Sequence, residues 1–221
     1  ALIGALRSGW APGGHALQAV ALSRSSDPAL DLLDESSISR AAQWVRAQSQ
    51  DAGRAVRLVI DATGWLHGDG RAPEKALRQV DAAHMAHAFA VNAIGPALLM
   101  KHFLPLLPRQ ERAVFATLSA KVGSIGDNQL GGWHSYRASK AALNQLVRTA
   151  AIELARSHPH AVCVAVHPGT VDTPLSAPFS RSGLTVRPPA EAAARLLAVL
   201  ADLTPERSGR FIDHTGGDLP W

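Results

Sequence analysis

Short apolar runs alternate with longer amphipathic stretches along most of the chain. Such runs are typical of parallel strands that are buried on both faces. They predict strands at residues 1–5, 15–24, 55–64, 112–120, 160–169 and 209–217. The stretches between them predict a helix near Ser37, capped by Asp34 or a following serine, and helices over residues 74–103, 138–155 and 189–203. This alternation predicts an α/β fold, with a doubly wound parallel sheet between two helical layers.

Candidates for a binding site gather at the carboxyl ends of the expected strands. Ligands of open parallel sheets bind in the crevice beyond these ends. The ends fall at Gly4, Ser23, Arg24, Asp61 to Gly64, Ser119, and Pro168 to Thr173. We therefore expect a rim that can receive a dinucleotide.

The connection between the first two expected strands is too short for a helix. A crossover with its helix needs at least about 10 to 12 residues, whereas residues 6–15 are interrupted by glycines and a proline. Either this unit has a deletion or residues are missing after Ala5, and we favour missing residues. The glycine-rich segment 9–14 is interpreted as a surface turn.

The composition limits the classes of function. The chain has 221 residues, 47% hydrophobic and 18% charged, which fits one globular domain over residues 1–221. The single cysteine, Cys163, excludes an internal disulfide framework and fits a reducing, cytoplasmic compartment. A net charge of +4 without a basic block gives no support to nucleic-acid binding, but it suits an anionic cofactor. No apolar run is expected to approach a membrane span, and we recognise no signal peptide.

Three further signals are weaker. His84 and His87 are three residues apart, but no carboxylate or cysteine completes a familiar spacing, so no metal is expected. Trp133 either walls a substrate pocket or packs within its own loop. Residues 174–188 contain Gly, Ser and Pro without a helical period and suit a short lid.

Tyr136 and Lys140 lie four residues apart near the start of the longest expected helix. Residues at this spacing share a face of a helix, so the phenol and the ammonium can point into the same space. A nearby ammonium favours phenolate and lowers the pKa of a proton donor that is otherwise too weak near neutral pH. Such a spacing also arises by chance, so the proton-transfer site that it predicts depends on its surroundings.

Four motifs around this pair carry a resemblance to a known family. They are YRASK at 136–140, VNAIG at 91–95, DATG at 61–64 and HPGTVDT at 167–173. With them the chain resembles the short-chain dehydrogenase/reductase family over essentially its whole length apart from the first connection. It is most similar to the carbonyl-reductase-like branch with the C-factor-type proteins. The resemblance implies a Rossmann-type α/β/α fold in three layers that binds NAD(P).

The resemblance also implies roles for individual residues. Tyr136 would be the general acid/base, and Lys140 would lower its pKa and hold the nicotinamide ribose. Asn92 would position the water of a proton relay, while Val171 and Thr173 would contact the nicotinamide amide and the neighbouring phosphates. The other implied cofactor residues are Gly4 in the glycine-rich loop, Asp31 and Leu32 at the adenine, Ala62, Gly64, Pro168 and Gly169.

The chain departs from the family pattern at three places. Asp61 and the following alanine replace two asparagines, and residues 3–5 are all that represents the glycine-rich loop. Ala120 stands where the family has its catalytic serine. Ser119, Ser124 or a water would then have to hold the substrate carbonyl, and we favour Ser119.

The expected activity is that of an oxidoreductase that interconverts a carbonyl and an alcohol. Arg24 can pair with a 2′-phosphate, and no acidic residue beside it is placed to bind a ribose 2′-OH, which favours NADP while NAD remains possible. The alternative is a catalytically weak nucleotide-binding or signalling protein on the same scaffold. The expected partner is a small-molecule carbonyl or alcohol, and the apolar residues of the two long helices predict a homodimer or homotetramer.

Overall fold

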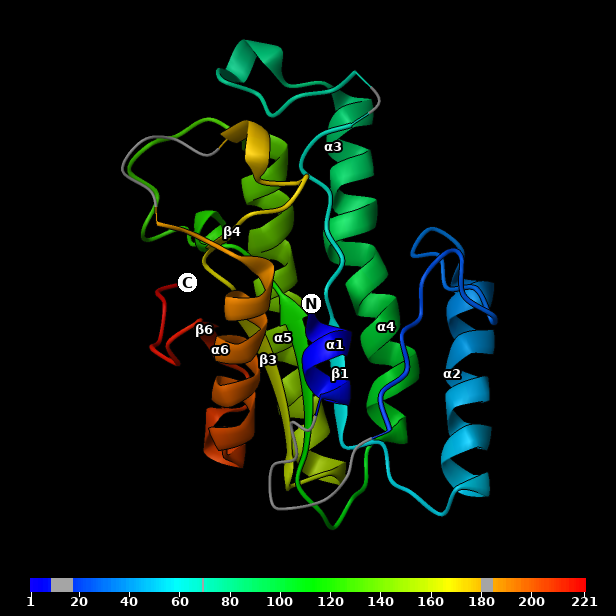
Figure 1. The fold of residues 1–221 in the computed structure, drawn as a ribbon. Coiled ribbons are helices and arrows are strands. Elements are labelled where there is room, and N and C mark those ends of the chain that lie inside the picture. Colours follow the sequence, from blue (N-terminus) through cyan, green and yellow to red (C-terminus); the bar gives the residue numbers. More distant parts are fainter. Residues whose placement is uncertain (9–17, 69, 180–184) are drawn as a thin grey trace.

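A parallel sheet of four strands, in the order β1-β2-β3-β6, lies at the centre of the molecule (Figure 1). Its strands are β1 (Leu58–Asp61), β2 (Ala113–Leu118), β3 (Ala161–His167) and β6 (Phe211–Asp213). The structure, a computed structural model, describes residues 1–8, 18–68, 70–179 and 185–221. Each of the four strands falls within a predicted apolar run.

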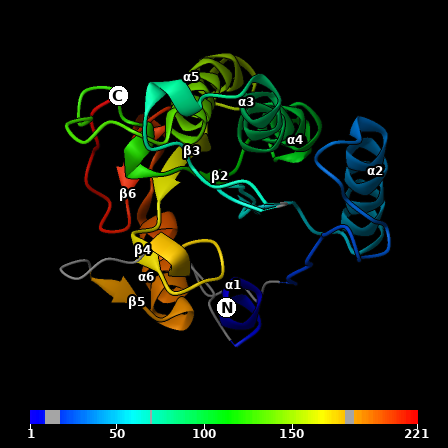
Figure 2. The same cartoon turned by 90° about the horizontal axis from the view of Figure 1, so that it is seen from above.

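Helices cover both faces of the sheet (Figure 2). They are α1 (Leu2–Arg7), α2 (Glu35–Asp51), α3 (Ala82–Phe89), α4 (Gly95–Phe103), α5 (His134–Ser157) and α6 (Pro189–Asp202). Neighbouring residues of a strand face opposite sides, so Phe115 belongs to the apolar cluster formed with α2, α4 and α5, whereas Val114 belongs to the cluster formed with α6. This arrangement confirms the doubly wound α/β fold in three layers.

The long helix expected at residues 74–103 starts later and is not uniform. It begins at Ala82 after Asp81, whose carboxylate accepts a hydrogen bond from His84 N at 2.8 Å. A π-helical turn over Ala90–Ile94 then separates α3 from α4. The prediction of helix over residues 74–81 is therefore wrong, except for a short 3-10 turn at Leu77–Gln79.

The segment Ala82–Leu106 is long and apolar enough, by length and composition alone, to cross a membrane. The expectation that no run approaches that length is therefore wrong. In this fold the segment packs against α5 and the sheet, and Leu99 and Phe103 are buried in the core. A core helix and a membrane span share this composition, so length and composition do not distinguish them here.

The N-terminal run is a helix, and the strand predicted at residues 1–5 is wrong. α1 closes its own hydrogen bonds, such as Ala5 N to Ala1 O at 3.0 Å, and packs against α6. A short apolar run suits either a strand or a buried helix, and a helix does not need a neighbouring strand to satisfy its backbone. Gly4 therefore lies within a helix and not in a loop after a strand.

The second predicted strand is also wrong in its described part. Residues 18–24 are not in the sheet, and Val20 is 47% exposed. The described sheet ends at β1, and no described strand lies between β1 and this run. The segment instead closes a turn in which Leu30 N donates to Ser23 O at 2.8 Å. The predicted turn at residues 9–14 lies outside the described residues.

Candidate active site

A cavity of about 1530 Å³ opens at the carboxyl ends of the strands. It brings together nine of the residues predicted for catalysis or cofactor binding. They are Ala62, Gly64, Ser119, Tyr136, Lys140, Pro168, Gly169, Val171 and Thr173. Segments that are far apart in the sequence thus meet around one space, as the crevice rule for parallel sheets predicts.

The remaining predicted residues do not belong to the described lining of this cavity. Gly4 lies in α1, although Leu2 and Ile3 beside it do reach the cavity. Ser23 and Arg24 lie in the turn before α2, and Asp31 donates its backbone N–H to Ser37 Oγ at 2.9 Å.

Leu32 packs closely on α4. A Cβ added to Gly95 would lie 2.8 Å from Leu32 Cβ, so only glycine allows this approach. The structure therefore gives Leu32 a packing role, and its predicted contact with adenine stays a prediction.

Tyr136 and Lys140 lie on one buried face of α5, with 9% and 2% of their surface exposed. Lys140 Nζ is 6.0 Å from the centre of the tyrosine ring. Burial raises the pKa of Tyr136 to about 12. The expected lowering of this pKa by Lys140 is therefore absent here, because removal of the phenol from water dominates.

Lys140 is held from two sides. Its ammonium donates to the carbonyl oxygen of Leu118 at 2.8 Å. Its Cβ packs directly on Gly123, where an added Cβ would lie only 2.7 Å away. Burial lowers the pKa of Lys140 to about 8, and the charge of Asp61 opposes this shift. The hydrogen bond thus holds the ammonium beside the cavity, although its removal from water disfavours the charged form.

Asp61 supplies the negative charge near Lys140. Its carboxylate accepts hydrogen bonds from Thr117 Oγ1 at 2.6 Å and from Thr63 N and Oγ1 at 3.0 and 2.6 Å. The aspartate that replaces an asparagine of the family pattern is thus held in place by the two threonines, and its charge acts on Lys140.

Asn92 lies behind Gly64 and is fully buried in the π-helical turn. Its Oδ1 accepts from Trp65 N at 2.7 Å, and its Nδ2 donates to Trp65 O at 2.7 Å and to Ser139 Oγ at 3.1 Å. π-Helical turns inside α-helices are frequent at functional sites. Asn92 thus joins the strand end after β1 to α5, a connection that its sequence position did not reveal.

The serine candidates are both engaged within the protein. Ser119 lines the cavity, but its hydroxyl donates to Asn144 Oδ1 at 2.7 Å. Ser124 accepts from Asp127 N at 3.0 Å and donates to Trp221 O at 3.3 Å. Ser119 must release Asn144 before it can hold a carbonyl, so its catalytic role stays a prediction.

Aromatic side chains wall the cavity above Tyr136. The Trp133 ring lies 6.2 Å from Tyr136 and 5.2 Å from Phe179, centre to centre. Trp133 lines the cavity, as one of its two interpretations predicts. His67 Nε2 donates towards the carbonyl oxygens of Pro174 and Leu175 at 3.2 and 3.1 Å, which holds the described start of the expected lid.

His167 is the imidazole at the end of β3 that lines the cavity. Burial, together with the nearby His214, lowers its pKa to about 4. The ring is therefore neutral near pH 7 and does not compete with Tyr136 as a charged proton donor.

Comparison with known proteins agrees with this geometry. A family model described as "Enoyl-(Acyl carrier protein) reductase" matches residues 18–199, which is most of the chain. The chain belongs to the short-chain dehydrogenase/reductase family. The fold and the resemblance predicted from the four motifs are thereby confirmed.

Curated relatives and solved structures are similar to this chain over most of its length. C-signal of Myxococcus xanthus is 37% identical over 66% of this chain and 84% of its own length. The 1-hydroxy-2-glutathionyl-2-methyl-3-butene dehydrogenase of Rhodococcus sp. (strain AD45) is 30% identical over 88% and 80%. The NADPH-bound carbonyl reductase from chicken fatty liver has a TM-score of 0.75 and 28% identity over 87% of this chain and 76% of that chain. The putative dehydrogenase/reductase of Burkholderia multivorans with bound NADP has a TM-score of 0.68 and 26% identity over 87% and 76%.

Proposed function

We propose that this protein is an NADP-dependent reductase that converts a small-molecule carbonyl to an alcohol, and the reverse. The observation that carries the proposal is the pair of Tyr136 and Lys140, buried on one face of α5 at the wall of a large cavity. The likeness to two solved structures with bound NADPH or NADP supports the choice of cofactor.

In this proposal Tyr136 transfers the proton. Its hydroxyl gives a proton to the carbonyl oxygen in reduction and becomes a phenolate, and in oxidation the phenolate takes the proton of the alcohol. Lys140 can exchange its bond with Leu118 O for a ribose hydroxyl, which would bring its positive charge to the reacting end of the cofactor. Reduced nicotinamide, when bound, supplies the hydride, while the chain orients the reactants and excludes water.

The residues around the cavity fit a dinucleotide. The volume of about 1530 Å³ exceeds the ordinary range for small-molecule pockets of about 300 to 1,000 Å³. Gly64 leaves the space between Asn92 and Lys140 free, since a Cβ there would lie 3.8 Å from both side chains. Pro168, Gly169, Val171 and Thr173 would hold the nicotinamide end, and Arg24 would pair with the 2′-phosphate.

The second candidate is a catalytically weak nucleotide-binding or signalling protein. It is favoured by Ala120, which replaces the serine of the family pattern, and by the inward hydrogen bond of Ser119. The relative named C-signal is compatible with either candidate. Turnover separates them, because a binding protein retains affinity for the nucleotide without oxidising it.

The decisive experiment compares the protein with its Tyr136→Phe variant. Removal of a general acid typically costs about 10²- to 10⁴-fold in rate, so carbonyl-dependent NADPH oxidation is expected to fall by about 10³-fold. NADPH binding, followed by fluorescence titration, should stay within about twofold because the ring remains. Equal turnover by the two proteins contradicts Tyr136 as the proton donor.

A further inference from the structure

The first turn of α5 has an unusual cap. A helix leaves its first N–H groups without partners inside the helix, and a short polar residue before it commonly accepts one of them. Trp133 holds that position in a left-handed conformation, φ 54° and ψ 41°, and its side chain makes no capping hydrogen bond to the described residues. Tyr136 lies in this first turn, so the contacts that hold the turn also place the phenol.

A carboxylate from a distant segment takes the place of the missing cap. Glu74 Oε2 accepts a hydrogen bond from Ser135 N at 3.2 Å, and Glu74 Oε1 accepts one from the Ser135 hydroxyl, across 61 residues of sequence. The backbone oxygen of Glu74 accepts from Trp133 N at 2.5 Å. Glu74 is 3% exposed and Ser135 is fully buried, so water cannot easily replace the carboxylate.

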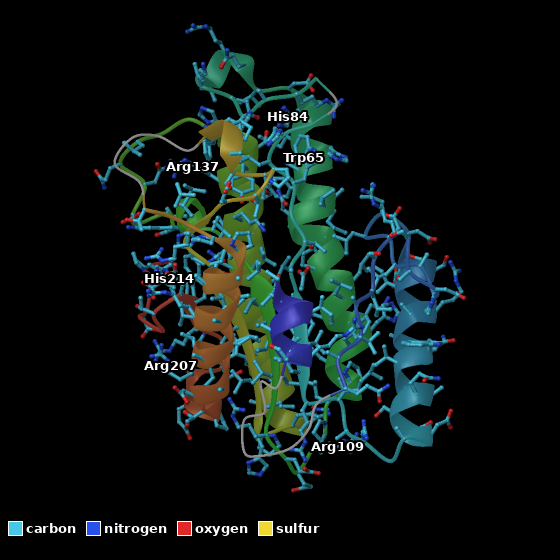
Figure 3. The ribbon with its side chains drawn as sticks, in the orientation of Figure 1. Trp65, His84, Arg109, Arg137, Arg207 and His214 are labelled. Atoms are coloured by element: carbon cyan, nitrogen blue, oxygen red, sulfur yellow. The ribbon has the colours of Figure 1, made fainter. Side chains whose placement is uncertain are left out.

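The charge of Glu74 suits this position. Burial raises the pKa of Glu74, but the hydrogen bonds from Ser135, a bond from its own backbone and the nearby His84 together hold it below the ordinary value. The positive end of a helix dipole also favours a negative charge. His84 packs edge-on against Trp65, with ring centres 5.0 Å apart, and the two residues lie side by side near the top of Figure 3.

Lys140 does not depend on Glu74. It lies one turn further along α5, where the helix closes its own hydrogen bonds, and its ammonium is bound to Leu118 O. Loss of the Glu74 carboxylate would therefore loosen the turn that carries Tyr136 and leave the ammonium in place. The two members of the catalytic pair are held by separate contacts.

We propose that Glu74 is a positioning residue, which caps α5 from outside the helix and holds the Tyr136 hydroxyl at the cavity. This inference rests on the proposed function of Tyr136 as the proton donor. Glu74 itself does not touch the substrate or the cofactor. It acts through Ser135 and the backbone of the first turn.

The test compares Glu74→Ala and Glu74→Gln with a matched cap on another helix. Asp34 caps α2 through Ser36 N at 2.9 Å, so Asp34→Ala removes a carboxylate cap remote from the pair. A displacement of about 1 Å costs about 10²-fold in rate, so Glu74→Ala should lower kcat by about 10- to 100-fold, with the Kd for NADPH within twofold. Glu74→Gln keeps one acceptor oxygen and should recover part of the loss, while Asp34→Ala should leave kcat unchanged.

A second readout does not need activity. Tyr136 is the only tyrosine, so fluorotyrosine incorporation gives one ¹⁹F resonance from this site. We expect this resonance to shift and broaden in Glu74→Ala, less in Glu74→Gln, and not in Asp34→Ala. Should Glu74→Ala not fold, the Glu74→Gln protein carries the comparison.

The outcomes separate this inference from the proposed function. An unchanged ¹⁹F resonance and unchanged kcat in a folded Glu74 variant overturn the positioning role, while wild-type turnover still supports the reductase. Equal losses of kcat in the Glu74 and Asp34 variants overturn the positioning role as well, because the loss would then not depend on the cap beside Tyr136. If the wild type does not oxidise NADPH with carbonyls, the proposed function fails, and the ¹⁹F resonance still decides whether Glu74 places Tyr136.

Discussion

The surroundings of Tyr136 and the segment 18–34 differ in how they are held. Around Tyr136, hydrogen bonds arrive from residues far along the chain, including Glu74, Trp65 and Leu118. Along 18–34 most of the bonds join residues a few positions apart, such as Ser26 N to Ser23 O at 3.2 Å. Long-range hydrogen bonds hold a side chain in place relative to other elements of the fold. Hydrogen bonds within a turn hold only the backbone of that turn.

This difference separates the two halves of the proposed site. In the proton-transfer half, Tyr136 and Lys140 are buried, and the turn that carries Tyr136 is bound to Glu74. The half that would receive the adenosine and the 2′-phosphate depends on Arg24, an exposed residue of a turn. Substitutions in the first half should therefore change kcat, and those in the second should change the affinity for the cofactor.

The largest effect after Tyr136→Phe is expected from Lys140→Met. Loss of a preorganised charge at a reacting centre costs about 10²- to 10³-fold, so kcat should fall to that extent in a steady-state assay. Asp61 would also lose its cationic neighbour, and Asp61→Asn in the same background should restore stability but not turnover. A Lys140→Met enzyme with normal kcat would remove the ammonium from the mechanism.

The same variant gives a pH test of stability. The pKa of Lys140 falls from its ordinary value of 10.5 to about 8 on folding, because burial disfavours the ammonium. The unfolded chain thus binds more protons between pH 8 and 10.5, and the free energy of unfolding rises with pH across this window by about 3 kcal/mol. The difference in unfolding free energy between the wild type and Lys140→Met should grow with pH in the wild type's favour. Tyr136, whose pKa is raised, loses its contribution as pH rises from 10 towards 12 in both proteins.

Features of the fold and the site that depend on residues close together in the sequence could be predicted, whereas those that depend on residues far apart could not. The runs of β2 and β3 show in the sequence because all their residues except Thr117 and His167 are apolar. The face shared by Tyr136 and Lys140 follows from helical spacing. The role of Glu74 does not show, because its partner is 61 residues away. The run at 1–5 is predicted as a strand, and this prediction is wrong because the segment forms α1 and packs against α6.

A smaller effect is expected at Ser119, which lines the cavity together with Tyr136 and Lys140. If its hydroxyl leaves Asn144 to hold the substrate carbonyl, Ser119→Ala should lower kcat by about 10²-fold, as for one lost oxyanion donor. Ser124→Ala is the matched control, since this hydroxyl is also bound within the protein, to Asp127 N and Trp221 O, and Ser124 is not part of the described lining of the cavity. Steady-state rates with one ketone compare them. A change below threefold in Ser119→Ala would show that the hydroxyl serves only to bind Asn144.

The smallest effect is expected in the second half, from Arg24→Ala. A hydrogen bond between charged groups contributes about 1.5 to 3 kcal/mol, so the KM for NADPH should rise by about tenfold or more. The KM for NADH should change little, because NADH lacks the 2′-phosphate, and kcat should stay the same. Arg156→Ala removes the same charge from an exposed position near the end of α5 and should leave both KM values unchanged. An unchanged ratio of the two KM values in Arg24→Ala would show that Arg24 does not bind the 2′-phosphate. Other residues would then have to explain a preference for NADP.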